Sequence, residues 1–205
     1  TEDSITWTLT VRDGMKWHDG EPVTADDIKF TLEYLDTQTE GGYASSYAEL
    51  NVIDEKTIDL VLPAANPRQL ANLTVLRIMP KHIYEGVEDY TTVPNEQANI
   101  GCGPYVFAGF DPDAGAVSFT ANKDYPDGAP AADTVILQLF DSEDTMYMAL
   151  KSGEIDMVYR YSGGVSASVI EDLQASGNLT LQPVSNTANS ASLIFNNSAE
   201  PFTNA

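Results

Sequence analysis

Hydrophobic and polar residues alternate at the start of the chain and then change to a helical spacing. Residues 7–11 alternate Trp, Leu and Val with Thr, which predicts a strand with one buried face. Asp-Gly dipeptides flank a second short run, Met15–Trp17, and predict turns on both sides of it. Thr24 then precedes an apolar stripe of helical period and is a candidate N-cap, with Asp27 three residues on. The stripe consists of Ile28, Leu32 and Leu35. Residues 7–35 are therefore predicted to form a β-β-α module.

Shorter apolar runs continue to residue 85 and predict small elements. We expect two hairpin strands, a short helix, a short strand and a helical turn, at Leu50–Ile53, Thr57–Leu62, Pro67–Leu73, Val75–Ile78 and Pro80–Tyr84. Residues 86–99 are polar and have no clear period, so a domain boundary is expected there. We therefore predict a smaller α+β domain over 1–97 and part of an α/β domain over 98–205.

The second half of the chain has longer apolar runs separated by helical patterns. Expected strands are Tyr105–Phe107, Val117–Phe119, Val135–Phe140, Ile155–Tyr159, Leu179–Leu181 and Ala191–Phe195. The nearly continuous run 135–140 predicts a strand buried on both faces. A helix capped by Asp141 and ended by Gly153 would join it to the strand at 155–159 as a βαβ unit. A second helix is expected at 166–176.

Charge and composition limit the classes of molecule that the protein is expected to bind. The formal net charge of the 205 residues is −21, shared by 1–97 (18 acidic, 7 basic residues) and 98–205 (13 acidic, 3 basic). Such even acidity is typical of a solvated surface, and it argues against nucleic acid or anionic lipid as partners, since both need clustered Lys and Arg. No apolar run is long enough to span a membrane, and no signal peptide is visible.

Residues capable of catalysis or metal binding are few and scattered. His18 and His82 are the only histidines, and they lie far apart in the sequence. Cys102 is the single cysteine, which excludes an internal disulfide; we expect a buried small side chain rather than a reactive thiol. Adjacent acidic pairs are explained by helix ends, turns and polar helix faces. We therefore predict no catalytic residues, no metal site and no cofactor.

Five stretches carry ordered motifs. The longest, residues 7–30, is Trp-Thr-Leu-Thr-Val-Arg-Asp-Gly-Met-Lys-Trp-His-Asp-Gly-Glu-Pro-Val-Thr-Ala-Asp-Asp-Ile-Lys-Phe. The others are Met-Pro-Lys-His-Ile-Tyr-Glu at 79–85, Gly-Cys-Gly-Pro-Tyr at 101–105, Ala-Leu-Lys-Ser-Gly-Glu-Ile-Asp at 149–156, and Asn196 with Pro201-Phe202. Together they resemble the peptide/nickel class of bacterial extracellular solute-binding proteins, family 5. Cys102 stands where that family usually has Thr.

This resemblance implies a fold. We expect an α/β, periplasmic-binding-protein-like fold of class II, present in part: a mixed sheet with flanking helices plus a smaller inserted α+β domain. In such proteins a second lobe closes over the ligand. The resemblance places Thr1 inside the family's sequence and Ala205 before its end. We therefore expect a piece of a larger protein that lacks the second lobe, with any membrane anchor outside this chain.

The resemblance also implies a function. It predicts the substrate-binding component of an ABC importer, extracellular or periplasmic, with a small peptide or similar solute as ligand and the transporter's permease subunits as partners. Ligands of open α/β sheets bind beyond the carboxyl ends of strands, which indicates Arg160 and Tyr161. The family's cleft residues before Asn196 correspond to Asn189, Ser190 and Ser192. Alternatives on the same fold are a nickel, haem or other metal-chelate binder and a peptide-presenting signalling receptor; a free-standing hydrolase lacks a nucleophile and base.

Overall fold

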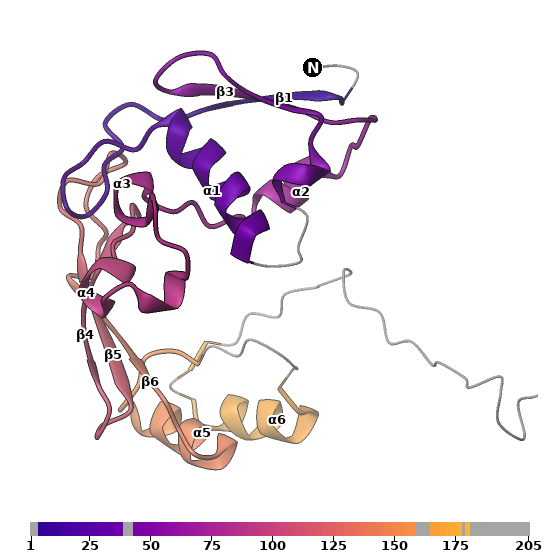
Figure 1. Ribbon diagram of the computed structural model, residues 1–205. Helices are drawn as coiled ribbons and strands as arrows, with labels where there is room; N and C mark the ends of the chain where they lie inside the picture. Colours follow the sequence, from indigo (N-terminus) through magenta and orange to yellow (C-terminus); the bar gives the residue numbers. More distant parts are fainter. Residues whose placement is uncertain (1–3, 39–42, 159–164, 178, 181–205) are drawn as a thin grey trace, which may run out of the picture. The chain divides into compact units, whose positions relative to one another are not determined.

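The computed structural model describes residues 4–38, 43–158, 165–177 and 179–180. The chain divides into two compact units, Thr1–Leu139 and Phe140–Ala205, which are described separately below. Within the described residues, the first unit holds two three-stranded sheets with helices of different length, and the second holds two helices (Figure 1). The predicted α/β class is confirmed, whereas the domain boundary at residue 97 stays a prediction.

The first sheet is built on a central strand from the predicted hairpin. Its order is β1 (Thr6–Thr10), β3 (Thr57–Val61), β2 (Glu49–Val52), and both pairings are antiparallel. The pairing of β1 with β3 places Leu9 opposite Ile58. These three strands confirm the predicted strand at 7–11 and the predicted hairpin.

Helix α1 (Ala25–Gln38) covers one face of this sheet (Figure 1). The core that they share consists of Ala25, Ile28, Leu32, Ile58 and Leu60, all buried. Burial of such side chains is the main favourable term in folding, at about 25 cal/mol per Å² of apolar surface. Leu35, the third member of the predicted stripe, is only partly buried, and Tyr34 is buried beside it.

The start of α1 has the predicted cap. Thr24 Oγ1 accepts a hydrogen bond from the Asp27 backbone N–H at 3.3 Å, and Asp27 Oδ2 accepts from the Thr24 backbone N–H at 2.8 Å. This reciprocal pair is a capping box with Asp in place of the usual Glu or Gln. The carboxylate also lies at the helix N-terminus, where the helix dipole favours negative charge.

Within the described residues up to 98, five short helices follow α1, the first before β2 and the other four between the two sheets along the chain. They are η1 (Ala44–Ser46), α2 (Gln69–Leu73), α3 (Lys81–Tyr84), η2 (Tyr90–Thr92) and α4 (Asn95–Ala98). The helices predicted near 67–73 and 80–84 are confirmed, the first beginning two residues late. Those within 86–99 were not predicted, because that segment has no hydrophobic period.

The strand predicted at Val75–Ile78 is wrong. Leu76 and Ile78 pack against the core around α1, but the segment pairs with no strand and Val75 is 73% exposed. The next backbone N–H, that of Met79, instead donates to the side-chain oxygen of Thr31 on α1 at 2.8 Å. The apolar run therefore marks burial against a helix and not a place in a sheet.

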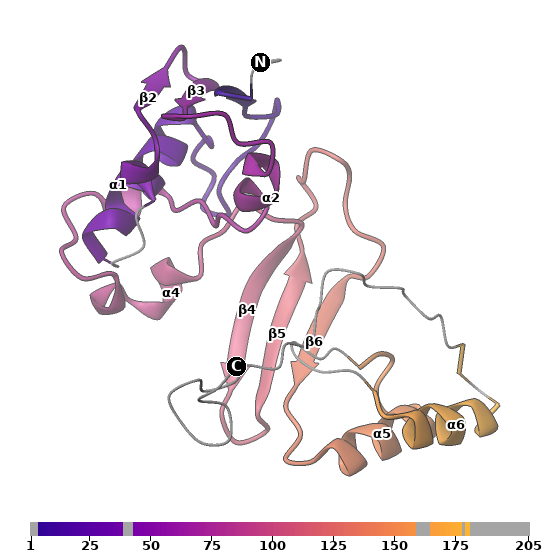
Figure 2. The same cartoon turned by 90° about the vertical axis from the view of Figure 1, so that its right-hand side faces the viewer.

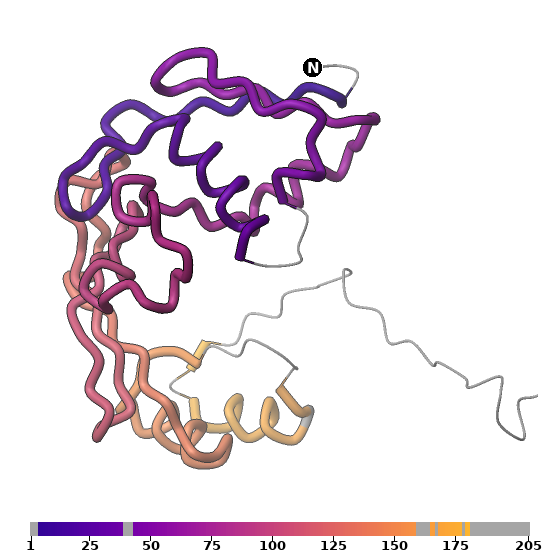
Figure 3. The backbone as a smooth tube through the Cα atoms, viewed as in Figure 1, coloured from indigo at the N-terminus to yellow at the C-terminus, as the bar shows by residue number. Residues whose placement is uncertain are grey.

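The second sheet is an antiparallel meander with the order β4 (Tyr105–Asp111), β5 (Ala116–Ala121), β6 (Thr134–Gln138) (Figure 2). It confirms the predicted strands near 105 and 117, and a bulge interrupts β4 between Phe107 and Gly109. The chain reaches β4 from α4 through residues 99–104 (Figure 3).

The strand predicted at 135–140 is confirmed as β6, but its predicted burial on both faces is wrong for the described residues. Strand β6 lies at an edge of its sheet, and Ile136 is 64% exposed. A continuous apolar run leads to burial on both faces only where other layers of the protein pack on both faces of the strand. In the described part of the chain, no layer covers Ile136.

The second unit contains α5 (Glu143–Ser152) and α6 (Ala167–Ala175). Ser142, and not the predicted Asp141, caps α5, since Ser142 Oγ accepts from the Thr145 backbone N–H at 3.2 Å. Gly153 ends α5 with a φ of 78°, as predicted, because glycine adopts this left-handed conformation without a steric penalty. An ion pair between Lys151 and Asp172, at 2.8 Å, joins the two helices.

The predicted βαβ unit is not formed in the described part of the chain. Residues 155–158 have no strand structure, and Tyr159 lies outside the described residues. A strand needs a hydrogen-bonded neighbour, and the structure provides none for this segment. Residues 179–180 also form no strand, and the rest of the strands predicted at 179–181 and 191–195 lies outside the described residues.

Candidate functional site

The five residues predicted to contact a ligand lie outside the part of the chain that the structure describes. They are Arg160, Tyr161, Asn189, Ser190 and Ser192. Their role in ligand binding stays a prediction. The polar clusters and cavities below all belong to the first unit.

A buried carboxylate joins three segments of the first unit. Asp27 is 4% exposed, and its Oδ2 atom accepts from the backbone N–H and hydroxyl of Thr24, at 2.8 and 2.9 Å, and from Trp17 Nε1 at 3.4 Å. Its Oδ1 atom accepts from the backbone N–H of Lys81, the first residue of α3, at 2.8 Å. A buried charge is stable only when it is fully hydrogen-bonded, and these four donors meet that need.

One turn along α1, Thr31 extends this polar face. Its hydroxyl donates to the Asp27 backbone carbonyl at 2.7 Å and accepts from the Met79 N–H at 2.8 Å. Asp27 and Thr31 together fix residues 79–81 against α1. The side-chain oxygens of Asp27 and Thr31 all hydrogen-bond to the protein's own backbone or side chains. We therefore assign this cluster a structural role.

His18 bonds a segment 83 residues away. Its Nδ1 accepts from the Gly101 backbone N–H at 3.2 Å, and its Nε2 lies 3.1 Å from the Gly103 carbonyl oxygen. Since Nδ1 accepts, the proton belongs on Nε2, which donates to Gly103. The His18 backbone N–H also donates to the Gly101 carbonyl at 2.8 Å. A side chain at 101 would crowd the ring, since its Cβ would lie 3.4 Å from His18 Cε1.

The ring of His82 contacts a different residue, Asp19, which follows His18 in the sequence. Its Nε2 lies 2.7 Å from Asp19 Oδ2, and its ring packs edge-on against Trp17 at 6.5 Å between centroids. Partial burial of Asp19 raises the pKa of that carboxyl, but the bonds from His82 and from the Glu21 backbone N–H outweigh burial and lower the pKa overall. Both histidines therefore bond protein groups, which sequence analysis did not foresee because their partners are distant in sequence.

Cys102 lies between the two glycines bonded by His18 and is half-buried. Burial raises the pKa of its thiol, and the charge of nearby Asp27 raises it further. A raised pKa lowers the fraction of reactive thiolate, but the expected burial of the side chain is only partial, and its lack of reactivity stays a prediction.

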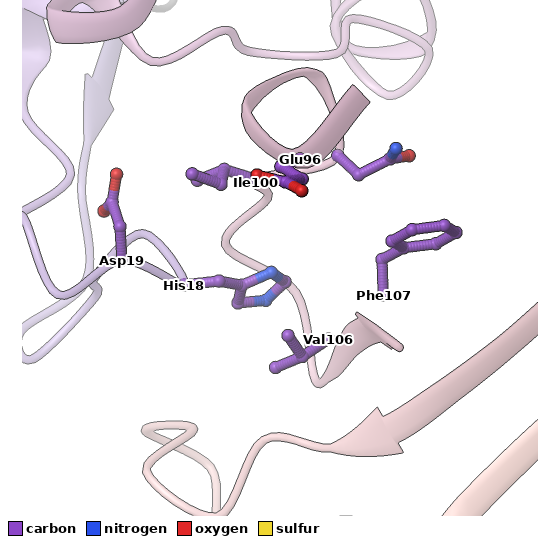
Figure 4. A pocket seen from close by; sticks show the side chains of 7 residues that line it. His18, Asp19, Glu96, Ile100, Val106 and Phe107 are labelled. Carbon is purple, nitrogen blue, oxygen red and sulfur yellow. The ribbon is translucent and has the colours of Figure 1, made fainter. Parts of the chain in front are cut away.

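A small cavity opens beside His18 (Figure 4). Its volume is about 150 Å³, and it is lined by His18, Asp19, Glu96, Asn99, Ile100, Val106 and Phe107. Binding sites for drug-sized ligands usually measure about 300 to 1,000 Å³. This cavity is therefore too small for more than a few atoms of a solute.

A larger cavity, of about 390 Å³, lies between the end of β3 and α2. It is lined by Leu32, Tyr43, Ser46, Tyr47, Leu62, Asn66, Gln69, Asn72, Leu73, Val75 and Leu76, none of which is charged. Buried Gln69 joins its polar groups: its Nε2 donates to Tyr47 Oη at 2.5 Å, and its Oε1 accepts from Asn72 Nδ2 at 3.3 Å. Such a lining suits uncharged groups of a ligand, and its side chains carry no formal charge.

Across the described residues, no group of three or more His, Cys, Asp or Glu side chains is placed to hold a metal ion. No helix among them is both long and apolar enough to cross a membrane.

Comparison with known proteins identifies relatives over most of the chain. A putative ABC transporter peptide-binding protein of Brucella ovis is 33% identical over 171 residues, which are 80% of this chain and 32% of that protein. The oligopeptide-binding protein AppA of Bacillus subtilis is 28% identical over 164 residues, 76% of this chain and 30% of AppA. The chain thus spans about a third of the length of these curated relatives.

Solved structures have the same fold. The ABC transporter substrate-binding protein CtaP of Listeria monocytogenes matches with a TM-score of 0.70 and 29% identity, over 86% of this chain and 36% of CtaP. Bacillus subtilis AppA, solved with a nonapeptide, matches with a TM-score of 0.63 and 25% identity, over 74% of this chain and 32% of AppA.

The family described as bacterial extracellular solute-binding proteins, family 5 Middle, matches residues 1–205. This family consists of solute-binding proteins and not of enzymes, which agrees with the interpretation of the sequence. The ordered motifs, the α/β fold and the family match over the full 205 residues lead to one conclusion: the chain belongs to the bacterial extracellular solute-binding proteins of family 5.

Proposed function

We propose that the full-length protein captures a peptide or related solute outside the cytoplasmic membrane and delivers it to the permease subunits of an ABC importer. The observation that carries this proposal is the family match over all 205 residues, together with relatives that are named ABC transporter peptide-binding proteins. Binding of this kind needs shape and a few polar groups, and no catalytic residue.

Within this proposal, the chain supplies one wall of the ligand site. Arg160, Tyr161, Asn189, Ser190 and Ser192 are the proposed contacts. The opposing wall belongs to a second lobe outside this chain. Closure of two lobes would bury the ligand and strengthen its hydrogen bonds by excluding water, so residues 1–205 alone should bind peptides weakly or not at all.

A peptide is a better candidate than a metal chelate. The fold alone leaves the question open, since NikZ of Campylobacter jejuni, solved with Ni(L-His), matches with a TM-score of 0.64 at 24% identity. In this chain, however, the two histidines already bond protein groups, His18 to Gly101 and Gly103, and His82 to Asp19. Neither is free to bind a metal unless those contacts break.

The test is isothermal titration calorimetry on the full-length protein with peptides of two to nine residues and, separately, with Ni(L-His). We expect micromolar or tighter binding of at least one class of peptide and none of the nickel chelate. Tight binding of the chelate without any peptide binding would overturn the peptide assignment.

The proposed contacts are tested by Tyr161→Ala and Asn189→Ala in the same protein. Each should weaken peptide binding about tenfold or more, because loss of a buried hydrogen bond or aromatic contact costs about 1–3 kcal/mol. Tyr90→Ala, at a 45% exposed position in the first unit, is the matched control and should leave the affinity unchanged. Deletion of the gene for this protein distinguishes import from a signalling role. Loss of uptake of a bound peptide would support import.

A further inference from the structure

The larger cavity, between the end of β3 and α2, combines an apolar lining with a few neutral polar groups. Five aliphatic side chains, two tyrosines, one serine, two asparagines and Gln69 line its volume of about 390 Å³. All of them lie within residues 32–76 of the first unit. A mostly apolar cavity of this size, with a few polar groups to fix orientation, is typical of a small-molecule site.

Two hydrogen-bond donors in this lining have no acceptor among the described residues. Tyr47 Oη accepts from Gln69 Nε2 at 2.5 Å, which leaves the hydroxyl proton of Tyr47 unused. Burial raises the pKa of this hydroxyl, so the proton stays in place. The same bond uses only one of the two N–H groups that Gln69 Nε2 carries. Gln69 is 4% exposed, and an unused donor on so buried a side chain is energetically costly.

Neighbouring amides hold Gln69 in this orientation. Its Oε1 accepts from Asn66 Nδ2 at 3.4 Å and from Asn72 Nδ2 at 3.3 Å. Asn66 Oδ1 in turn accepts from the Arg68 backbone N–H at 3.0 Å. The side-chain oxygens of Gln69 and Asn66 are therefore occupied, and a bound molecule can supply the acceptor that the two unused donors lack.

The charge of the lining limits the class of that molecule. No Lys, Arg, Asp or Glu lines the cavity, so a charged ligand would lose its hydration without gaining a counter-ion. The net charge of −21 disfavours anions further. Water could satisfy the donors, but it would leave the aliphatic side chains in contact with solvent. An uncharged molecule with an apolar body and an oxygen acceptor suits both parts of the lining.

We propose that the larger cavity binds an uncharged small molecule with an apolar body and a carbonyl oxygen, which accepts hydrogen bonds from Tyr47 and Gln69. The inference goes beyond import. It is independent of the proposed peptide contacts, which are different residues, at 160–161 and 189–192.

The test is fluorine NMR on the full-length protein with three probes that share a fluorinated ring. They are para-fluoroacetophenone, which has a carbonyl oxygen, para-fluoroethylbenzene, which lacks one, and para-fluorobenzoate, which is charged. We expect the ketone to bind with a dissociation constant of about 1 mM or lower, and the hydrocarbon to bind about fivefold or more weakly. The benzoate should not bind detectably. Ketone binding that is no tighter than binding of the hydrocarbon or the benzoate would overturn the proposal.

Two substitutions locate the site. Tyr47→Phe should weaken binding of the ketone to the level of the hydrocarbon and leave binding of the hydrocarbon unchanged. Val75→Trp, at a 73% exposed position of the lining, should abolish binding of both. The matched control is Ile53→Trp, 59% exposed and outside the lining, which should have no effect. Because Val75 and Ile53 are exposed, this pair decides the question if Tyr47→Phe does not fold; ketone binding that survives Val75→Trp would overturn the assignment.

A peptide that binds in calorimetry is added last. The ketone should bind equally well with and without it. Displacement of the ketone by the peptide would show that both occupy one site, and would overturn the proposal. If no peptide binds, the proposed function fails, while the probes and the variants still decide this inference.

Discussion

The carboxylate of Asp27 accepts a hydrogen bond from the backbone N–H of Lys81, 54 positions further along the chain, at 2.8 Å. Through this bond the start of α1 holds the start of α3. The same carboxylate accepts from Thr24 and Trp17, so a single buried charge organises three segments of the first unit.

Replacing Asp27 should therefore be costly. Asp27→Ala leaves the Thr24 and Lys81 N–H groups without an acceptor, and each unsatisfied buried donor costs about 1–3 kcal/mol. We expect the opening free energy of α1 to fall by about 2–4 kcal/mol, measured by native-state hydrogen exchange. Exposed Asp26→Ala, on the same helical turn, should cost less than about 1 kcal/mol. Equal costs for the two substitutions would contradict this role of Asp27.

The thiol of Cys102 should react slowly. Burial and the charge of Asp27 raise its pKa, which lowers the fraction of reactive thiolate near neutral pH. At pH 8 we expect native Cys102 to react with a disulfide reagent at least tenfold more slowly than the unfolded chain. A native rate equal to the unfolded rate would show that the site neither shields the thiol nor raises its pKa.

His18→Ala should loosen the segment around Cys102. The substitution removes the ring that accepts from the Gly101 N–H and bonds the Gly103 carbonyl. We expect exchange of the Gly101 amide and alkylation of Cys102 both to accelerate about tenfold or more, measured by mass spectrometry. His82→Ala is the control, since the His82 ring contacts Asp19 and Trp17, and it should leave the exchange of Gly101 unchanged.

Asp19 should make the protein sensitive to acid. Its pKa in the folded protein is lowered, so its contribution to stability is present above the unfolded pKa of about 4 and is lost as pH falls through the folded value. Asp19→Asn should thus destabilise by up to about 1 kcal/mol at pH 6 and much less at pH 3. Urea unfolding at the two pH values measures the difference. A loss of unfolding free energy that is larger at pH 3 than at pH 6 would contradict this prediction.

Gly153→Ala should destabilise the end of α5. The residue has a φ of 78°, and a side chain in this left-handed conformation costs about 1–2 kcal/mol. Amide exchange in the last turn of α5 should report a loss of that size. Ser152→Ala, one position earlier on the helix, should change it by less than about 0.5 kcal/mol. Equal losses of stability in the two variants would show that the backbone conformation at 153 does not determine the stability of the last turn of α5.

Local patterns predicted local structure well. The alternation at 7–11, the Thr24 cap and the glycine at 153 each depend on contacts within a few residues, and all three are confirmed. The segment Val75–Ile78 shows the limit of such patterns, because an apolar run reports burial but not the hydrogen-bond partner of the backbone. Its neighbour Met79 bonds to Thr31, a residue 48 positions away.

The polar clusters depended on distant partners and could not be predicted. Nothing near His18 in sequence indicates that its ring bonds Gly101 and Gly103, and nothing near His82 indicates Asp19. The lining of the larger cavity has no motif either, because its residues come from several separate segments. Among the candidate ligand contacts, Tyr161 was indicated by its place after a predicted strand, whereas Asn189 came from the family resemblance, and these are the two positions at which to test them.

The placement of β3 between β1 and β2 affects the order in which the first unit folds. Leu9 pairs with Ile58, so β1 and α1 must wait for residues synthesised much later before the first sheet is complete. Closing so long a loop slows folding, whereas β4 and β5 are joined by a short turn and can pair quickly. During synthesis β1 therefore emerges before β3 and can pair with it only after residues 57–61 have followed, which leaves Trp7 and Leu9 without their sheet contacts for that interval.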